Sequence, residues 1–328
     1  AAVKKIMEMA REDNRTMQHL DILCNRFGGR PIGSDAYENA AEWAMRCFRE
    51  WGYEVEYEKA GELSVGFNRG GWWGQMYGEE NMHLHFATPS FTAGTKGPQR
   101  GHVVIEPRTQ EQLNRVKHQL KGSWVLLNGH NRGWSFGYGK FWDERREQII
   151  KSNAEAEKWN REHAGEDGEK KHIDDDTAPL FHNQMVEAGI LGFVQKGTTP
   201  LTALYDRDVI RENIPFDSLP TMPNIILDEH QFDHIYRMAK ERRNVQLEFD
   251  IRNYFKIGPV SYHNVVATIK GSKYPDEYVI VGAHLDSYDV ATGGVDCGSG
   301  VSAVMEAARM IAASGAKPER TIIFILFA

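Results

Sequence analysis

This sequence lacks a disulfide framework, an excess of basic charge and any apolar run long enough to span a membrane. The three cysteines, Cys24, Cys47 and Cys297, are too few for a disulfide framework. Cys24 and Cys47 could pair, although two buried thiols are the simpler interpretation. Acidic residues outnumber basic ones, 46 to 39, which gives a net charge of −7 and argues against a nucleic-acid partner, because such binders carry a basic surface. No apolar run is long enough to span a membrane.

The length and the last residues indicate how the chain is organised. With 328 residues, the sequence is about twice the usual length of one domain, so two domains are expected. Residues Thr321–Ala328 form a continuous apolar run that is typical of a buried strand. Chain ends usually lie at the surface, so we expect the sequence to be an N-terminal portion of a longer protein.

Alternating α/β patterns are expected at both ends of the chain. Residues 1–23 read as a helix, and Gly28–Gly33 as a turn. Ser34 or Asp35 is a good N-cap for a helix that Gly52 ends. After residue 264 come strands, and a helix over 299–314 with Gly315 as its C-cap residue.

The middle of the chain has a different pattern of predicted elements. It contains short apolar segments typical of strands, separated by Gly/Pro turns and by two short helical segments. This pattern predicts a β-rich module. Within it, residues 134–176 form a long polar segment with a helical core over 141–161, which we expect to be a lid or a flexible insertion. Asp174–Asp176 could bind a cation, but a solvated run of charge is the more ordinary interpretation.

One stretch carries residues with evident chemistry, YVIVGAHLDSYDVATGGVDCGSG over 278–300. Its apolar start is typical of a buried parallel strand, and the strand ends at His284. A Gly-rich loop then leads to Asp296 and to the start of a helix. Open α/β sheets place their chemistry outside the carboxyl ends of the strands, and an imidazole with a carboxylate suits zinc or a similar ion.

The spacing suggests a role for each side chain and leaves alternatives open. Asp286 can orient His284 by accepting the proton of the imidazole nitrogen that faces away from the metal. Asp296 is either a metal ligand or an acidic residue stabilised at a helix N-terminus. Cys297 beside a helix start could be a thiolate nucleophile with His284, but nothing else in the sequence supports a cysteine enzyme.

A family resemblance rests on these motifs. HLDS, a Gly-rich loop, DCGSG, a helix and PERTIIFILFA together resemble the M28 family of co-catalytic zinc peptidases. NRFGGRPIGSDAYENAAEWAMRCFREWGYEVE resembles the opening of that family. KGSWVLLNG and EAGILGFVQKG resemble a protease-associated (PA) domain inserted into it. The resemblance covers most of the chain and is weakest over 134–176.

The resemblance implies a fold and a domain division. It implies an α/β fold whose mostly parallel central sheet is flanked by helices, with an inserted β-rich PA-like domain. Residues 1–80 are expected to begin the peptidase domain and residues 261–328 to form its core, truncated at the C-terminal end. Residues 81–260 are expected to form the PA-like domain, with 134–176 as an extra insertion.

The resemblance also implies an activity. His284 matches a ligand of one zinc ion, Asp296 the carboxylate that bridges two zinc ions, and Asp286 the catalytic-site residue that orients His284. The general base of the family and its remaining ligands fall after Ala328. We therefore expect a two-zinc exopeptidase, without excluding other divalent metals, that acts on a peptide or dipeptide. A secreted or periplasmic location is implied, and formation of a homodimer is left open.

Two other classes of protein remain to be weighed. A receptor-like relative without catalysis would keep the fold and the PA-like module for binding, but would have no reason to retain His284, Asp286 and Asp296. A serine hydrolase is the other alternative, and Cys297–Gly300 does not fit its nucleophile motif.

Overall fold

The structure, a computed structural model, divides the chain into two compact units. It describes residues 2–130, 136–137, 139–165, 168–174, 177, 179–201 and 207–328. Unit 1 comprises residues 1–68, 210–216 and 255–328, and unit 2 comprises residues 69–209 and 217–254. The units therefore change at residues 68 and 254, where the sequence placed domain bounds at 80 and 260. The assignment of these units to a peptidase and a PA-like domain stays a prediction.

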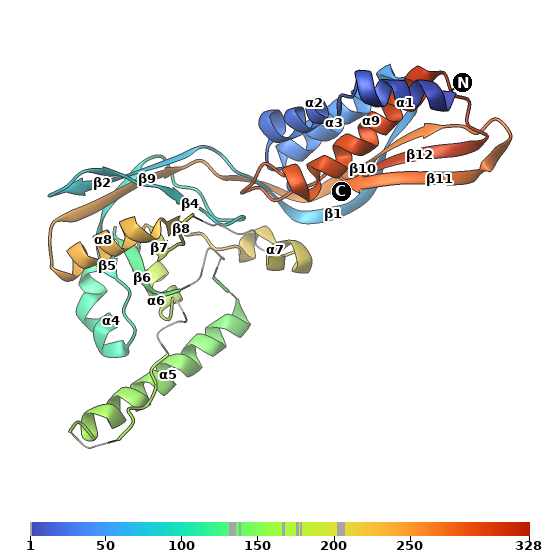
Figure 1. Ribbon diagram of the computed structural model, residues 1–328. Helices are drawn as coiled ribbons and strands as arrows, with labels where there is room; N and C mark the ends of the chain where they lie inside the picture. Colours follow the sequence, from blue (N-terminus) through green and yellow to red (C-terminus); the bar gives the residue numbers. More distant parts are fainter. Residues whose placement is uncertain are drawn as a thin grey trace. The chain divides into compact units, whose positions relative to one another are not determined.

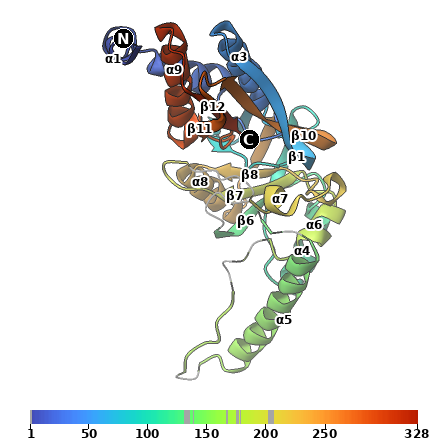
Figure 2. The ribbon, with the colours of Figure 1, turned by 90° about the vertical axis from the view of Figure 1, so that its right-hand side faces the viewer.

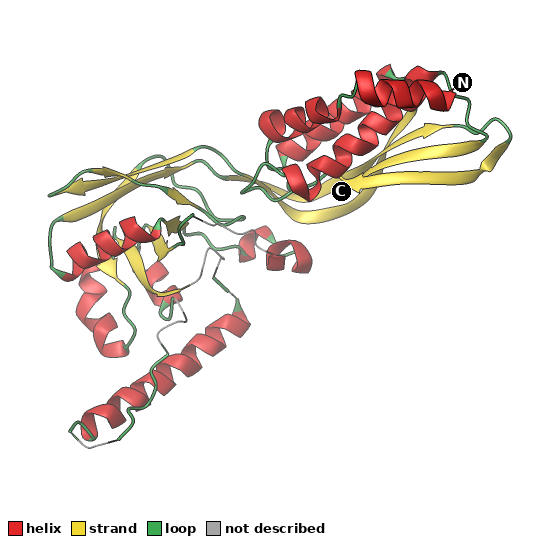
Figure 3. Cartoon of the chain, viewed as in Figure 1, coloured by secondary structure: helices red, strands yellow, loops and turns green. Residues whose placement is uncertain are grey.

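Unit 1 is a four-stranded sheet with helices packed on it (Figure 1). The strands, in sheet order, are β1 (Glu54–Asn68), β10 (Tyr254–Ile269), β12 (Arg320–Phe327) and β11 (Tyr274–His284). The helices are α1 (Ala2–Glu12), α2 (Thr16–Asp21), a π-helical turn (Ile22–Phe27), α3 (Asp35–Glu50) and α9 (Ser299–Ser314). Figure 3 shows α1, α2, α3 and α9 gathered on one side of the sheet.

The sheet of unit 1 is mixed, which corrects the expectation of a mostly parallel one. Strand β12 pairs in parallel with β11 but antiparallel with β10. The local pattern of β10 is no different from that of a parallel strand, because the direction of a neighbour depends on the connection and not on the strand's own residues.

The helix α3 shows why these residues form these elements. The Ser34 side chain caps it by accepting the main-chain N–H of Tyr37 at 3.1 Å. Apolar residues then recur with helical spacing and are buried: Tyr37, Ala40, Ala41, Ala44 and Phe48. Gly52 follows with φ of +90°, a conformation that glycine adopts without strain. Burial of Phe48, which is completely inaccessible to solvent, contributes about 1.5–3 kcal/mol.

The N-terminal helix is broken where the sequence predicted one helix over residues 1–23. Asn14 accepts the main-chain N–H of Thr16, and Glu306 of α9 accepts that of Arg15. These two side chains satisfy N–H groups that the helix would otherwise have bonded internally. One partner lies 291 residues away, so the break is invisible in the local pattern.

Unit 2 is built on an eight-stranded mixed sheet and also contains helices, so the module expected to be β-rich is mixed α/β. In sheet order its strands are β3 (Met82–His83), β2 (Trp72–Gly78), β9 (Val245–Ile251), β5 (Gln99–Ile105), β6 (Trp124–His130), β7 (Gly192–Lys196), β8 (Asn224–Leu227) and β4 (Phe86–Ala87). Strands β5 to β8 are parallel, and the outer pairs are antiparallel.

Five α-helices lie between residues 69 and 254 in the described part of the chain. They are α4 (Gln110–Val116), α5 (Lys140–Glu162), α6 (His182–Glu187), α7 (Arg207–Glu212) and α8 (Glu229–Lys240). The rotated view makes α5 easy to follow (Figure 2). Two groups of buried apolar side chains form the core, one containing Trp124 and Phe249 and the other Leu127 and Phe193.

Candidate metal centre

The candidate site lies where β11 ends. His284 is the last residue of β11 and stands opposite Phe327 of the parallel strand β12. A nine-residue loop, 285–293, follows and leads into a short π-helical turn, Gly294–Gly298, directly before α9. This loop occupies the position expected from the sequence, outside the carboxyl end of a parallel strand.

The structure brings all three predicted site residues together. The Nδ1 atom of His284 lies 2.8 Å from Oδ1 of Asp286, and its Nε2 atom lies 3.0 Å from Oδ1 of Asp296. Each ring nitrogen therefore faces a different carboxylate. An imidazole whose Nδ1–H is bound to a carboxylate has its Nε2 lone pair directed to the other side, which here is the side of Asp296.

The side chains of the site are open to solvent. The exposed fractions are 41% for His284, 34% for Asp286 and 61% for Asp296. Asp296 has non-helical backbone angles, and α9 begins three residues later with no side-chain cap. The Asp296 carboxylate therefore makes no capping hydrogen bond to α9 and faces His284 instead.

The donor atoms present fit part of a zinc site. Zinc binds imidazole nitrogen and carboxylate oxygen at about 2.0–2.2 Å, so two donors on one ion stand roughly 3–3.5 Å apart. The observed separation of 3.0 Å between Nε2 of His284 and Oδ1 of Asp296 falls within that range. Over the described ranges no cluster of three or more His, Cys, Asp or Glu side chains forms, so these residues alone supply an incomplete set of ligands.

Two further residues organise the site and were not recognised from the sequence. Arg30, predicted only as part of a turn, is completely buried, and its Nε donates to the carbonyl oxygen of Leu285 at 3.0 Å. Burial lowers the pKa of Arg30, while Cys24, Asp286 and Cys297 act in the opposite sense. Ser287, 5% exposed, accepts the main-chain N–H of Arg30. No local pattern marks Arg30 among 39 basic residues.

The cysteine and serine alternatives gain no support. All three cysteines are free, and the hydrogen-bond partners of the His284 ring are aspartates. The G-x-S-x-G spacing does occur once, at residues 133–137, but Ser135 lies outside the described residues.

The insertion expected over 134–176 contains helix α5, whose Ile149 and Ile150 pack against the buried cluster of Leu127 and Phe193. The side chains of Arg146, Asn153 and Ala156 are buried. Asn153 exchanges two hydrogen bonds with the main chain of Asp174, both at 2.9 Å, so the returning chain is held against the helix. The choice between a lid and a flexible insertion stays a prediction.

The acidic run within the insertion is described only in part. The Asp174 carboxylate accepts the main-chain N–H and the hydroxyl of Thr177 and lies 3.9 Å from Arg108. Asp175 and Asp176, like Trp134 at the start of the insertion, lie outside the described residues. Asp174 therefore acts as a turn residue paired with an arginine.

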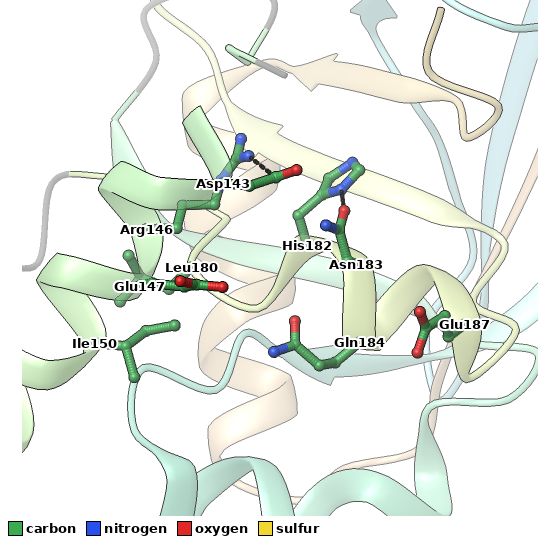
Figure 4. A pocket seen from close by; sticks show the side chains of 9 residues that line it. All are labelled: Asp143, Arg146, Glu147, Ile150, Leu180, His182, Asn183, Gln184 and Glu187. Atoms are coloured by element: carbon green, nitrogen blue, oxygen red, sulfur yellow. Dashed lines mark hydrogen bonds and ion pairs between the residues drawn. The ribbon is translucent and has the colours of Figure 1, made fainter. Parts of the chain in front are cut away.

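A pocket of about 230 Å³ lies between α5 and the region of α6 (Figure 4). Its walls include Asp143, Arg146 and Glu147 from α5, and Leu180, His182 and Gln184 from the facing segment. Arg146 donates to Asp143 at 3.2 Å, and the imidazole of His182 lies 2.8 Å from the side-chain oxygen of Asn183. Burial lowers the pKa of His182, so this imidazole is neutral near pH 7.

Comparisons with known proteins agree with the resemblance read from the sequence. The sequence model of peptidase family M28 matches residues 264–328. Carboxypeptidase Q of Pongo abelii is 34% identical over 112 residues, which are 34% of this chain and 23% of that protein. A probable zinc metalloprotease of Pyrenophora teres f. teres (strain 0-1) is 44% identical over 80 residues, 22% of this chain and 17% of that protein.

A solved structure shares the fold. The peptidase M28 precursor from Shewanella amazonensis SB2B is 20% identical, with a TM-score of 0.51 covering all of this chain and 66% of that one. The resemblance to M28 peptidases is thereby confirmed. The match spans about a quarter of the length of the carboxypeptidase Q relatives.

Proposed function

We infer that the chain is part of an M28-type metallopeptidase and propose that the complete protein is a two-zinc exopeptidase. The single observation that carries the proposal is the position of His284 between Asp286 and Asp296, with one carboxylate on each ring nitrogen. When bound, zinc supplies Lewis-acid activation of water and of the scissile carbonyl group.

Each of the three residues has a distinct role in the proposal. Asp286 accepts the Nδ1 proton of His284 and so fixes the ring orientation and the tautomer that leaves Nε2 free to bind a metal. Asp296 offers a carboxylate with two oxygens, only one of which faces His284, so the other is available to a second ion. The remaining ligands and the general base are expected from the family resemblance at positions after residue 328.

We propose that substrate preference depends on unit 2, as a PA-like domain, and on the insertion at 134–176. The support is the pocket between α5 and α6, one wall of which belongs to that insertion. Deletion of residues 134–176 should change KM or the ranking of substrates across a peptide panel. Unchanged kinetics over the panel would show that the insertion plays no part.

The competing function is peptide or protein binding without catalysis. The three retained side chains and their hydrogen-bonded arrangement favour the enzyme, since binding alone does not need metal ligands. A secreted or periplasmic location and a homodimer stay predictions. Within the described part of the chain, no helix has the length and apolar character needed to cross a membrane.

The proposal is tested with the complete protein and a panel of aminopeptidase, carboxypeptidase and dipeptidase substrates. We expect hydrolysis that a chelator abolishes and zinc restores. The His284→Ala variant should lose this activity, while His230→Ala, which alters an exposed imidazole, should retain it. A folded protein that hydrolyses none of the substrates, with or without zinc, would contradict the proposal.

A further inference from the structure

A buried guanidinium joins the two ends of the loop that carries the candidate site. The Arg30 side chain donates from Nε to the carbonyl oxygen of Leu285 at 3.0 Å, and from Nη1 to that of Thr292 at 3.1 Å. Its Nη2 donates to the carbonyl oxygen of Gly293 at 3.3 Å. Leu285 follows His284 directly and Gly293 precedes Asp296 by three residues, so one side chain spans the loop between the two candidate ligands.

The same arginine is itself held in place. Its Nη1 also donates to the carbonyl oxygens of Gly28 at 2.6 Å and Leu23 at 3.2 Å. Its main chain forms two hydrogen bonds with Ser287: the Arg30 N–H donates to the hydroxyl oxygen at 2.9 Å, and the Ser287 N–H donates to the Arg30 carbonyl oxygen at 3.0 Å. All of these guanidinium bonds go to main-chain oxygens, so the side chain fixes backbone positions.

Two glycines allow this close approach. A Cβ atom at Gly293 would lie 2.8 Å from Nη2 of Arg30 and 2.5 Å from the Ser287 side chain, and Gly293 has φ of +67°. A Cβ atom at Gly29 would lie 2.6 Å from the main chain of Asp289. A methyl group at Gly29 would therefore meet the main chain of the loop, and one at Gly293 would meet the side chains of Ser287 and Arg30.

We propose that Arg30 is a positioning residue for the metal centre, which fixes the distance between His284 and Asp296 by binding both ends of the intervening loop. The inference rests on the proposed function, because it assigns Arg30 a role in holding metal ligands. A nine-residue loop tied at both ends has few conformations, so the two ligands stay at the separation that one metal ion requires.

A general structural role for a buried arginine is the alternative, and the chain offers a matched control. Arg309 of α9 lies in the same unit and is 7% exposed. It donates to Glu306 at 2.8 Å and to Asp13 at 3.0 Å, both of which lie outside the loop 285–293. Substitution of either arginine by lysine removes a buried guanidinium, but only Arg30→Lys frees the loop.

The experiment compares zinc affinity in the complete protein, its Arg30→Lys and Arg309→Lys variants, and the milder Ser287→Ala variant. Zinc affinity is measured by competition with a chromophoric chelator, and thermal unfolding gives the stability of each protein. We expect Arg30→Lys to weaken zinc binding by about 10–100-fold, the usual effect of removing a partner that orients metal ligands. Ser287→Ala should weaken it less, and Arg309→Lys should leave it unchanged despite a comparable loss of stability.

Hydrogen exchange of the metal-free proteins provides a readout that does not depend on zinc. Amides in residues 285–296 should exchange faster in Arg30→Lys than in Arg309→Lys. Equal zinc affinities, or equal exchange rates of this loop, in the two lysine variants would overturn the proposal. If Arg30→Lys does not fold, Ser287→Ala decides by the same comparison. A wild-type protein that binds no zinc would overturn the proposed function, and the exchange rates would then decide separately whether Arg30 holds the loop.

Discussion

Replacement of Glu106 by glutamine should release both ends of the insertion in unit 2. The Glu106 side chain is fully buried and accepts main-chain N–H groups from Asn128, before the insertion, and from Leu180, after it, both at 2.9 Å. It also accepts from the buried Arg108 at 3.0 Å, whose guanidinium in turn donates to the carbonyl oxygen of Asp174 at 2.9 Å. One carboxylate thus links the two chain segments at which the insertion begins and ends.

The magnitude follows from these contacts. A glutamine oxygen can replace only one carboxylate oxygen, so its NH₂ group faces a donor and one main-chain N–H loses its partner, at a cost of about 1–3 kcal/mol. Arg108, 6% exposed, also loses its buried counter-charge. Removal of one partner of a buried ion pair costs about 3–5 kcal/mol in total, and we expect unit 2 to lose this much stability.

The assay is urea unfolding combined with hydrogen exchange of the amides of Asn128 and Leu180. Glu187→Gln is the control, because it makes the same chemical change at an exposed residue of α6 and should alter stability by no more than about 0.5 kcal/mol. A loss of unfolding free energy below about 1 kcal/mol for Glu106→Gln, or unchanged protection of both amides, would refute the proposed role of Glu106.

Three further predictions concern unit 1. Burial alone would raise the pKa of Glu306, but hydrogen bonds, chiefly from Arg309, outweigh it and lower the pKa below 4.5. The resulting stabilisation is present above pH 4.5 and is lost as the pH falls through the lowered pKa. Glu306→Gln should therefore flatten the acid limb of a plot of stability against pH, and an unchanged limb would refute the assignment. Gly293→Ala places a methyl group 2.5 Å from the Ser287 side chain, so it should lower both the unfolding temperature, measured by calorimetry, and the zinc affinity, measured by chelator competition. Unchanged values would show that the loop has room for the methyl group. Burial raises the pKa of Cys47 to about 11. In a variant with the other two cysteines replaced by serine, the Cys47 thiol should therefore react with a disulfide reagent at pH 8 only after unfolding. Rapid reaction of the folded protein would contradict the burial of Cys47.

Local signals in the sequence predicted the elements around the site well. Helix α9 was predicted over 299–314 and spans those residues, with Gly315 at φ of +72° as its C-cap, because an apolar stripe and a terminal glycine are readable within one segment. The grouping of His284 with Asp286 and Asp296 followed from their positions at the end of one strand and before the next helix.

Long-range partners explain what the sequence could not predict. The bonds of Arg30 to the loop span 255 to 263 residues, so nothing near Arg30 distinguishes it from a surface arginine. The break in the N-terminal helix depends in the same way on Glu306. The antiparallel pairing of β10 with β12 is also set by the path of the chain and not by the residues of either strand.

The zinc content of the complete protein tests the central claim most directly. Wild-type protein, its Asp296→Asn variant and a control Asp276→Asn variant, changed at an exposed residue of β11, would be dialysed against the same trace of zinc and analysed by elemental mass spectrometry. We predict about two zinc ions per chain for wild type and control, and a loss of zinc from folded Asp296→Asn. Equal zinc contents in Asp296→Asn and wild type, or no zinc in any of the three folded proteins, would contradict the account.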